Sequence, residues 1–185
     1  MSLANHHINQ LVDMCRSQNQ QAQMELYRRY YKAMYNTSLR IVKDSFEAED
    51  IMQDSFLSAF TQLDKLSENS KFGAWLKRIV VNNSIGHYHK KQKENTTGIE
   101  DMLYKMEDQS TEEVIEPANI SASEIKEAIN GLKESYAISL TLHLIEGYDY
   151  EEIAQIMQIS NGNSRTLISR AKTQLRSRLT SLKNS

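Results

Sequence analysis

Apolar side chains recur every three or four residues in several stretches of the chain, the spacing that places them on one face of an α-helix. In the first half of the chain these stretches are residues 22–42, 47–63 and 72–91. The second stretch is the most sharply divided. Its apolar half holds Ile51, Met52, Phe56, Ala59, Phe60 and Leu63, and its polar half holds Asp50, Gln53, Asp54 and Thr61, with Leu57 among them. Three such helices are enough to form one compact helical domain.

The second half of the chain shows the same periodicity with clearer start and stop signals. A helical pattern over residues 125–145 contains Gly131 as a possible break, and Gly147 follows its end. Asp149 with Glu152 has the spacing of a capping box and predicts a short helix over 150–157. Ser160 is the expected cap of a last helix that runs to about residue 182. Its apolar stripe is Leu167, Ile168, Ala171, Leu175, Leu179 and Leu182.

Composition narrows the fold class. The chain has 185 residues but only 6 glycines and 1 proline, too few for the many turns of an all-β fold. Its single cysteine, Cys15, excludes an internal disulfide framework and a cysteine-based zinc site. No run reaches the ~18 apolar residues of a membrane span, and the first residues lack the apolar stretch of a signal peptide. These features predict an all-α, cytoplasmic protein.

Charge divides the chain into three blocks. Residues 1–95 carry 13 basic and 10 acidic side chains, residues 96–124 carry 1 and 8, and residues 125–185 carry 8 and 6. The acidic block contains the only proline and little periodicity, as expected for a flexible linker. We therefore predict helical domains at 1–95 and 123–185, joined by an acidic linker at 96–122.

The last two predicted helices have the layout of a helix-turn-helix, in which a short capped helix precedes a longer basic one. Side chains on the long helix that lie away from its apolar stripe are Arg165, Thr166, Ser169, Arg170 and Lys172. Arginine suits guanine because its fork donates two parallel hydrogen bonds to O6 and N7. The alternative is an ordinary helical hairpin with a solvated basic face.

Two segments carry a resemblance to a known family. Residues 140–179, with EGYDYEEIAQIMQISNGNSRTLISRAKTQL, resemble region 4 of sigma-70-family sigma factors. Residues 47–91, with EAEDIMQDSFLSAF and FGAWLKRIVVNNSIGHYHKK, resemble region 2. The order of the two segments, with no region 3 domain between them, is similar to that of the extracytoplasmic-function (ECF) subgroup.

The resemblance implies a protein that is not an enzyme and needs no cofactor, metal or small-molecule substrate. It implies binding to core RNA polymerase, through the β′ coiled coil and the β subunit, and to promoter DNA, which the protein would help to open. It also implies an anti-sigma factor as a partner and a linker that enters a channel of the polymerase. A linker that serves only as a tether is the alternative.

Site residues follow by matching position. Asp50, Gln53 and Asp54 match the helix that binds the β′ coiled coil. The residues that match the −10 and melting surface are Trp75, Lys77, Arg78, Asn82, Asn83, His87 and Lys90. The residues that match the −35 recognition helix are Arg165, Thr166, Ser169 and Arg170, with Lys172 and Arg176 as candidates for phosphate contacts. For Trp75, which lies in an apolar stripe, packing in the core is the stronger alternative.

Two other functions remain open from the residues. A helix-turn-helix regulator that acts without polymerase would share the C-terminal pattern but would bind its operator alone, often as a dimer. A metal-dependent enzyme would have to use His6, His7, His87 and His89, but no carboxylate motif accompanies them at metal-ligand spacing.

Overall fold

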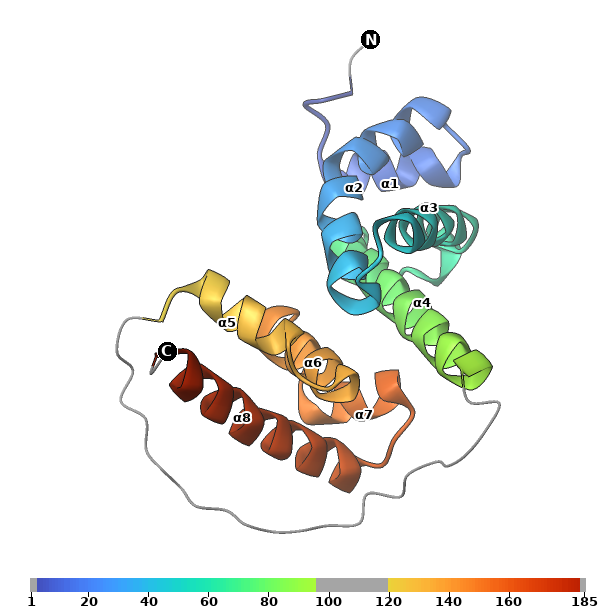
Figure 1. Cartoon of the computed structure of the whole chain (residues 1–185). Helices are drawn as coiled ribbons and strands as arrows, with labels where there is room; N and C mark the ends of the chain where they lie inside the picture. The colour runs from blue at the N-terminus through green and yellow to red at the C-terminus, as the bar shows by residue number, and fades with distance from the viewer. Residues whose placement is uncertain (1–2, 96–119, 184–185) are drawn as a thin grey trace. The chain divides into compact units, whose positions relative to one another are not determined.

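A computed structural model describes residues 3–95 and 120–183, and every element in these ranges is helical. Contacts divide the chain into two compact units, Met1–Lys91 and Gln92–Ser185 (Figure 1). The elements of the first unit are α1 (Ile8–Arg16), α2 (Gln20–Val42), α3 (Ser45–Thr61), the 3-10 turns η1 (Leu63–Lys65) and η2 (Asn69–Lys71), and α4 (Phe72–Asn95), whose last residues lie beyond it. The prediction of an all-α protein with two small helical domains is confirmed.

Local chemistry sets the ends of the first-unit helices. The Asn19 side chain accepts a hydrogen bond from the backbone N–H of Ala22 at 3.0 Å and so begins α2. Lys43 ends α2 in a left-handed conformation, with φ of 60°. Asp44 follows at once and caps α3 by accepting from the N–H groups of Phe46 and Glu47, both at 2.9 Å.

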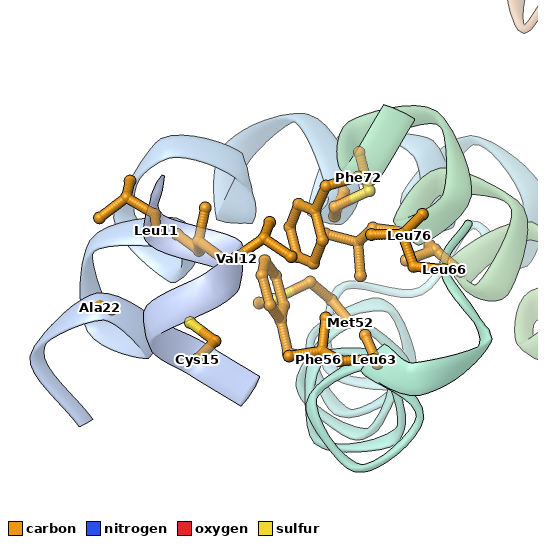
Figure 2. Close-up of a cluster of buried hydrophobic side chains, with 14 residues drawn as sticks. Leu11, Val12, Cys15, Ala22, Met52, Phe56, Leu63, Leu66, Phe72 and Leu76 are labelled. Atoms are coloured by element: carbon orange, nitrogen blue, oxygen red, sulfur yellow. The ribbon is translucent and has the colours of Figure 1, made fainter. Parts of the chain in front are cut away.

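The core of this unit lies where α1, α2, α3 and α4 meet (Figure 2). Val12 of α1, Phe56 of α3 and Phe72 of α4 are all almost wholly buried there, together with Leu26 of α2. Aromatic contacts extend this core, since Tyr27 lies 4.8 Å from Phe56 and Tyr30 lies 5.5 Å from Phe72 between ring centroids. The apolar stripes read from the sequence therefore face one another.

Helix α1 was not predicted, because its 9 residues span too few turns for the apolar spacing to repeat clearly. Its Leu11 and Val12 are fully buried, and its Arg16 fixes the connection between α3 and α4. The Arg16 guanidinium donates to the Leu66 carbonyl at 3.0 Å and to Asn69 Oδ1 at 2.7 Å. The Asn69 amide in turn donates to Asp13 Oδ1 at 2.7 Å.

The second unit contains α5 (Ala122–Asn130), α6 (Glu134–Leu140), the π-helical turn η3 (Thr141–Ile145), α7 (Tyr150–Met157) and α8 (Asn161–Lys183). The predicted helix over 125–145 is thus interrupted after Asn130, at the possible break near Gly131. Gly147 has φ of +82°, a conformation that glycine adopts without steric cost. Asp149 and Glu152 form the predicted capping box, and Ser160 Oγ accepts from the Asn163 N–H at 3.1 Å.

Residues 96–119 of the predicted linker and the side chain of Leu182 lie outside the described residues. Helix α5 begins at Ala122, the last residue of the predicted linker. Among the helices of the two described ranges, none is both long and apolar enough to cross a membrane.

Candidate functional site

The outer side of α3 combines acidic and apolar side chains. Asp50, Gln53 and Asp54 are all exposed, as predicted from their polar half of the helix. Phe46 and Leu57, which are 80% and 65% exposed, lie on the same side because they are spaced three, four or seven residues from these polar positions. This surface, formed by Phe46, Asp50, Gln53, Asp54 and Leu57, is called the α3 surface below.

The contribution of Phe46 was missed in the sequence. A phenylalanine in the first turn of a helix is expected to pack inward. The signal that could have identified its exposure is its spacing of four residues before Asp50 and eleven before Leu57. Exposed apolar side chains beside charged ones are typical of protein-binding surfaces. The α3 surface therefore has the composition of a site for a basic, partly apolar protein.

Helix α4 carries the predicted −10 residues on more than one side. Trp75, Arg78 and Asn82 lie along one side, at spacings of three, four and seven residues. Asn82 is exposed, and Trp75 is half-buried with its ring centroid 6.2 Å from that of Phe72. Trp75 therefore packs against the core, as the alternative held, while part of its ring stays accessible to a ligand.

The structure does not bring the other predicted −10 residues to this side. The Asn83 amide donates to Ser55 Oγ of α3 at 2.9 Å, and His87 Nε2 lies 3.2 Å from Glu47 Oε2. Glu47 also pairs with Lys91 at 3.1 Å. Asn83 and His87 thus contact α3, although Asn83 is also exposed, and their place in the −10 surface stays a prediction.

The two remaining −10 candidates are placed differently again. Lys77 follows Trp75 by two residues, which in a helix puts it on nearly the opposite side. Lys90 is exposed near the C-terminal end of α4.

Helix α8 presents its predicted residues more simply. Arg165, Thr166, Ser169 and Arg176 are exposed, and three of them form one row at spacings of four and seven residues. The opposite side of the helix is buried through Ile168, Ala171 and Leu175. Thr166 Oγ1 donates to the Gly162 carbonyl of its own helix at 3.0 Å. Arg170 is half-buried.

Lys172 differs from the expectation that it lies in the open with its neighbours. It is half-buried, with its Nζ 3.2 Å from His143 Nε2 and 3.5 Å from the Tyr150 hydroxyl. Neither His143 nor Tyr150 was identified from the sequence, because single aromatic residues at helical spacing are usually core residues. Their pairing with Lys172 joins residues 29 and 22 positions apart and is visible only in the fold.

Family models match both units of the chain. The model described as "Sigma-70 region 2" matches residues 26–94, and that described as "Sigma-70, region 4" matches residues 122–175. The ECF RNA polymerase sigma factor SigM of Bacillus subtilis is 30% identical over 156 residues, which cover 82% of this chain and 91% of that protein. This chain belongs to the ECF subgroup of the sigma-70 family. The RNA polymerase sigma-H factor of Pseudomonas aeruginosa is 28% identical, with 88% and 89% of the two chains covered.

Solved structures share the fold. The sigma factor RpoE of Bartonella quintana, solved in complex with the anti-sigma factor NepR, has a TM-score of 0.54 at 21% identity, with 85% of this chain and 96% of that chain covered. CnrH, solved with the cytosolic domain of CnrY, has a TM-score of 0.55 at 20% identity, with 94% and 97% covered.

Family membership decides between the functions that the sequence left open. Sigma factors act with core RNA polymerase, so a regulator that works without polymerase is not favoured. The family is also one of transcription factors rather than enzymes. Within residues 3–95 and 120–183, no group of three or more His, Cys, Asp or Glu side chains is arranged to hold a metal ion.

Proposed function

We propose that this ECF sigma factor divides its work among three helical surfaces. The α3 surface binds core RNA polymerase, the outer side of α4 contacts the −10 element as DNA opens, and the outer row of α8 reads the −35 element. The observation that carries this proposal is the α3 surface, where two large apolar side chains stay exposed beside acidic ones.

The composition of the α3 surface supports a polymerase contact. Asp50 and Asp54 can pair with basic side chains of a coiled coil, while Phe46 and Leu57 can bury apolar area against it. All these side chains are accessible without any rearrangement of the helix. We propose that the α3 surface binds the β′ coiled coil of the polymerase and that the second unit binds the β subunit.

The outer side of α4 supports contact with opened DNA. A half-exposed indole can stack on an unpaired base, and the Asn82 amide can donate to and accept from a base edge. Arg16 bonds to Leu66 and Asn69 in the connection before α4 and so holds the segment from which this helix begins.

The outer row of α8 supports duplex recognition. Arg165 lies in the second turn of the helix, where a recognition helix meets base edges in the major groove. Arg176 lies three turns further on and is placed for a phosphate contact. Thr166, Ser169 and Arg170 complete the proposed −35 surface.

The regulatory partner is proposed by analogy with the relatives. Two structures of similar fold contain sigma factors bound to an anti-sigma factor or to a cytosolic domain of another protein. We propose that an anti-sigma factor binds this chain and covers its polymerase-binding surface. We further propose that the protein acts in the cytoplasm and catalyses no reaction of its own.

The proposed polymerase contact is tested by charge reversal on the α3 surface. We expect Asp50→Lys with Asp54→Lys to weaken binding to core polymerase about tenfold or more, because like charges would then face a basic partner. The melting temperature should hardly change, since both side chains are exposed. Affinity for purified core polymerase and a thermal melt measure the two effects.

Asp64→Lys with Glu68→Lys is the control with the same change of net charge, because both are exposed acids outside the α3 surface. It should leave polymerase binding unchanged. Equal affinity of the α3-surface variant and the control would remove the α3 surface from the polymerase interface.

A further inference from the structure

The side chain of Tyr150, at the start of α7, lies between a histidine and two cations of the recognition helix. Its ring stacks on His143, with centroids 5.0 Å apart and planes at 29°. The guanidinium carbon of Arg165 lies 5.4 Å from the ring centroid, and Lys172 Nζ lies 5.8 Å from it. Both distances fall within the ~6 Å range of a cation–π contact.

The backbone holds this arrangement in place. Ser164, fully buried at the start of α8, donates from Oγ to the Tyr150 carbonyl at 2.8 Å. The first turn of α8 and the first residue of α7 are therefore fixed to each other. The Tyr150 ring has a defined position beneath Arg165.

The hydrogen bonds of His143 define its tautomer. Nδ1 lies 3.0 Å from the Tyr148 carbonyl oxygen, which can only accept, so Nδ1 carries the hydrogen. In the neutral ring Nε2 is then an acceptor, and the Lys172 ammonium 3.2 Å away donates to it. A protonated ring would have a donor at Nε2 as well, and two cations would face each other at this distance.

The charged and titratable groups around His143 belong to α8, to α7 with its cap, and to the residues that follow His143 in the chain. Lys172 and, across the Tyr150 ring, Arg165 belong to α8, while Tyr150 belongs to α7. Asp149 directs its carboxylate to the N–H groups of Glu151 and Glu152 at the start of α7. Glu146, three residues after His143, is buried. Of these groups, Lys172 contacts the edge of the His143 ring and Tyr150 stacks on its face.

We infer that Tyr150 and His143 are positioning residues of the −35 surface: Tyr150 directs Arg165 toward DNA, and neutral His143 holds Lys172 back from it. This inference rests on the proposed function of α8. Protonation of His143 ends its hydrogen bond with Lys172 and repels the ammonium group. Lys172 then becomes available for a phosphate, and the protein binds DNA more tightly at lower pH.

A double-mutant cycle tests the role of Tyr150 with holoenzyme and a promoter that contains a matched −35 element. We expect Tyr150→Leu to weaken binding about two- to fivefold, the size of an exposed cation–π contact. Tyr150→Phe keeps the ring and should stay close to wild type. In an Arg165→Ala background, Tyr150→Leu should cause no further loss, because the side chain that it positions is absent. The role of Tyr150 would be overturned if Tyr150→Leu causes no loss of affinity, or if its loss adds fully to that of Arg165→Ala.

A pH series tests the role of His143 while the Tyr150 side chain stays in the protein. His143→Gln keeps an acceptor and a donor but does not titrate. As the pH is lowered and His143 takes up a proton, wild-type holoenzyme should gain affinity for DNA and its salt slope should steepen by about one. His143→Gln should not show this rise in DNA affinity. The other four histidines are present in both proteins, so the difference isolates His143. Identical pH profiles of wild type and His143→Gln would overturn the role of His143. This test does not depend on whether Tyr150→Leu folds.

The failure of this inference is distinguishable from that of the proposed function. If Arg165→Ala alone leaves matched-promoter binding unchanged, α8 does not read the −35 element through Arg165 and the proposed function fails. Arg165→Ala can instead weaken binding while the double-mutant cycle shows additive losses and the two pH profiles are identical. In that case only the positioning roles of Tyr150 and His143 are lost.

Discussion

Helices α4 and α8 are both long, carry several basic residues and were both predicted to bind DNA, yet they offer their polar side chains very differently. Helix α4 buries Phe72, Leu76, Val80 and Val81, and polar residues beside this stripe bond to α3. Helix α8 buries one side, and its row of Arg165, Ser169 and Arg176 stays exposed.

The difference shows that charge in a helix is not the same as charge available to a ligand. Neighbouring helices use polar side chains of α4 to satisfy their own buried or charged groups, as Ser55 and Glu47 do. On α8 the clearest case is Lys172, whose Nζ lies within 3.5 Å of both His143 Nε2 and the Tyr150 hydroxyl. The number of packed sides, more than composition, sets how much of each helix can meet DNA.

The largest effects should come from truncating the core side chains that anchor the two helices. Leu76→Ala on α4 and Ile168→Ala on α8 each remove a fully buried side chain, which typically costs about 2–5 kcal/mol of unfolding free energy. If the two units have separate cores, each variant should destabilise only its own unit.

Cys15 reports on the first unit alone. It is 3% exposed, and burial raises the pKa of its thiol to about 11, so little thiolate is present at pH 8. Alkylation of Cys15 should therefore require unfolding of the first unit and should accelerate in Leu76→Ala. Acceleration of similar size in Ile168→Ala would show that the units share one cooperative transition.

Next in size is the loss of a base contact on α8. Arg165→Ala should cost about 1–3 kcal/mol, or roughly 5- to 150-fold, on a promoter with a matched −35 element and much less on a scrambled one. Arg176→Ala should weaken both promoters alike and lower the salt slope by about one. Holoenzyme binding at several salt concentrations separates the two, and equal behaviour of both variants would mean that the row reads no bases.

A pair of neighbours on α4 should separate stability from DNA binding. Asn83→Ala removes the hydrogen bond to Ser55 and should lower the unfolding free energy by about 1 kcal/mol, with little change in promoter opening. Asn82→Ala should leave stability within about 0.5 kcal/mol, since its side chain is exposed, and should impair opening at the −10 element. Thermal melts and permanganate reactivity of the −10 thymines measure both, and a reversed outcome would exchange the two roles.

The smallest effect concerns Glu47, which pairs with His87 and Lys91. Glu47→Gln should cost less than about 1 kcal/mol, because these are partly exposed ion pairs. It should steepen the salt slope of DNA binding by about one as Lys91 becomes available. Glu49→Gln makes the same change of charge at an exposed site two residues away. If the salt slope steepens equally in Glu49→Gln, the effect comes from net charge rather than from the released Lys91 side chain.

The sequence by itself determined the helices and their inner sides. Periodic positions such as Phe56, Leu76 and Ile168 could be assigned to the core because helical geometry repeats every 3.6 residues. Asp149, Glu152 and Ser160 could be assigned as caps because capping depends on a few neighbouring residues. The same local rules did not identify α1, a helix of 9 residues whose Leu11 and Val12 pack in the core.

Only the tertiary structure decided which polar side chains remain for a ligand. Asn82 and Asn83 are adjacent, chemically identical and both exposed, but the Asn83 amide bonds to Ser55, twenty-eight residues away. Lys172 looks as open as Arg165 in the sequence, but His143 and Tyr150 hold it. A helical pattern fixes the direction of a side chain around its own axis, whereas its availability depends on what the other helices place there.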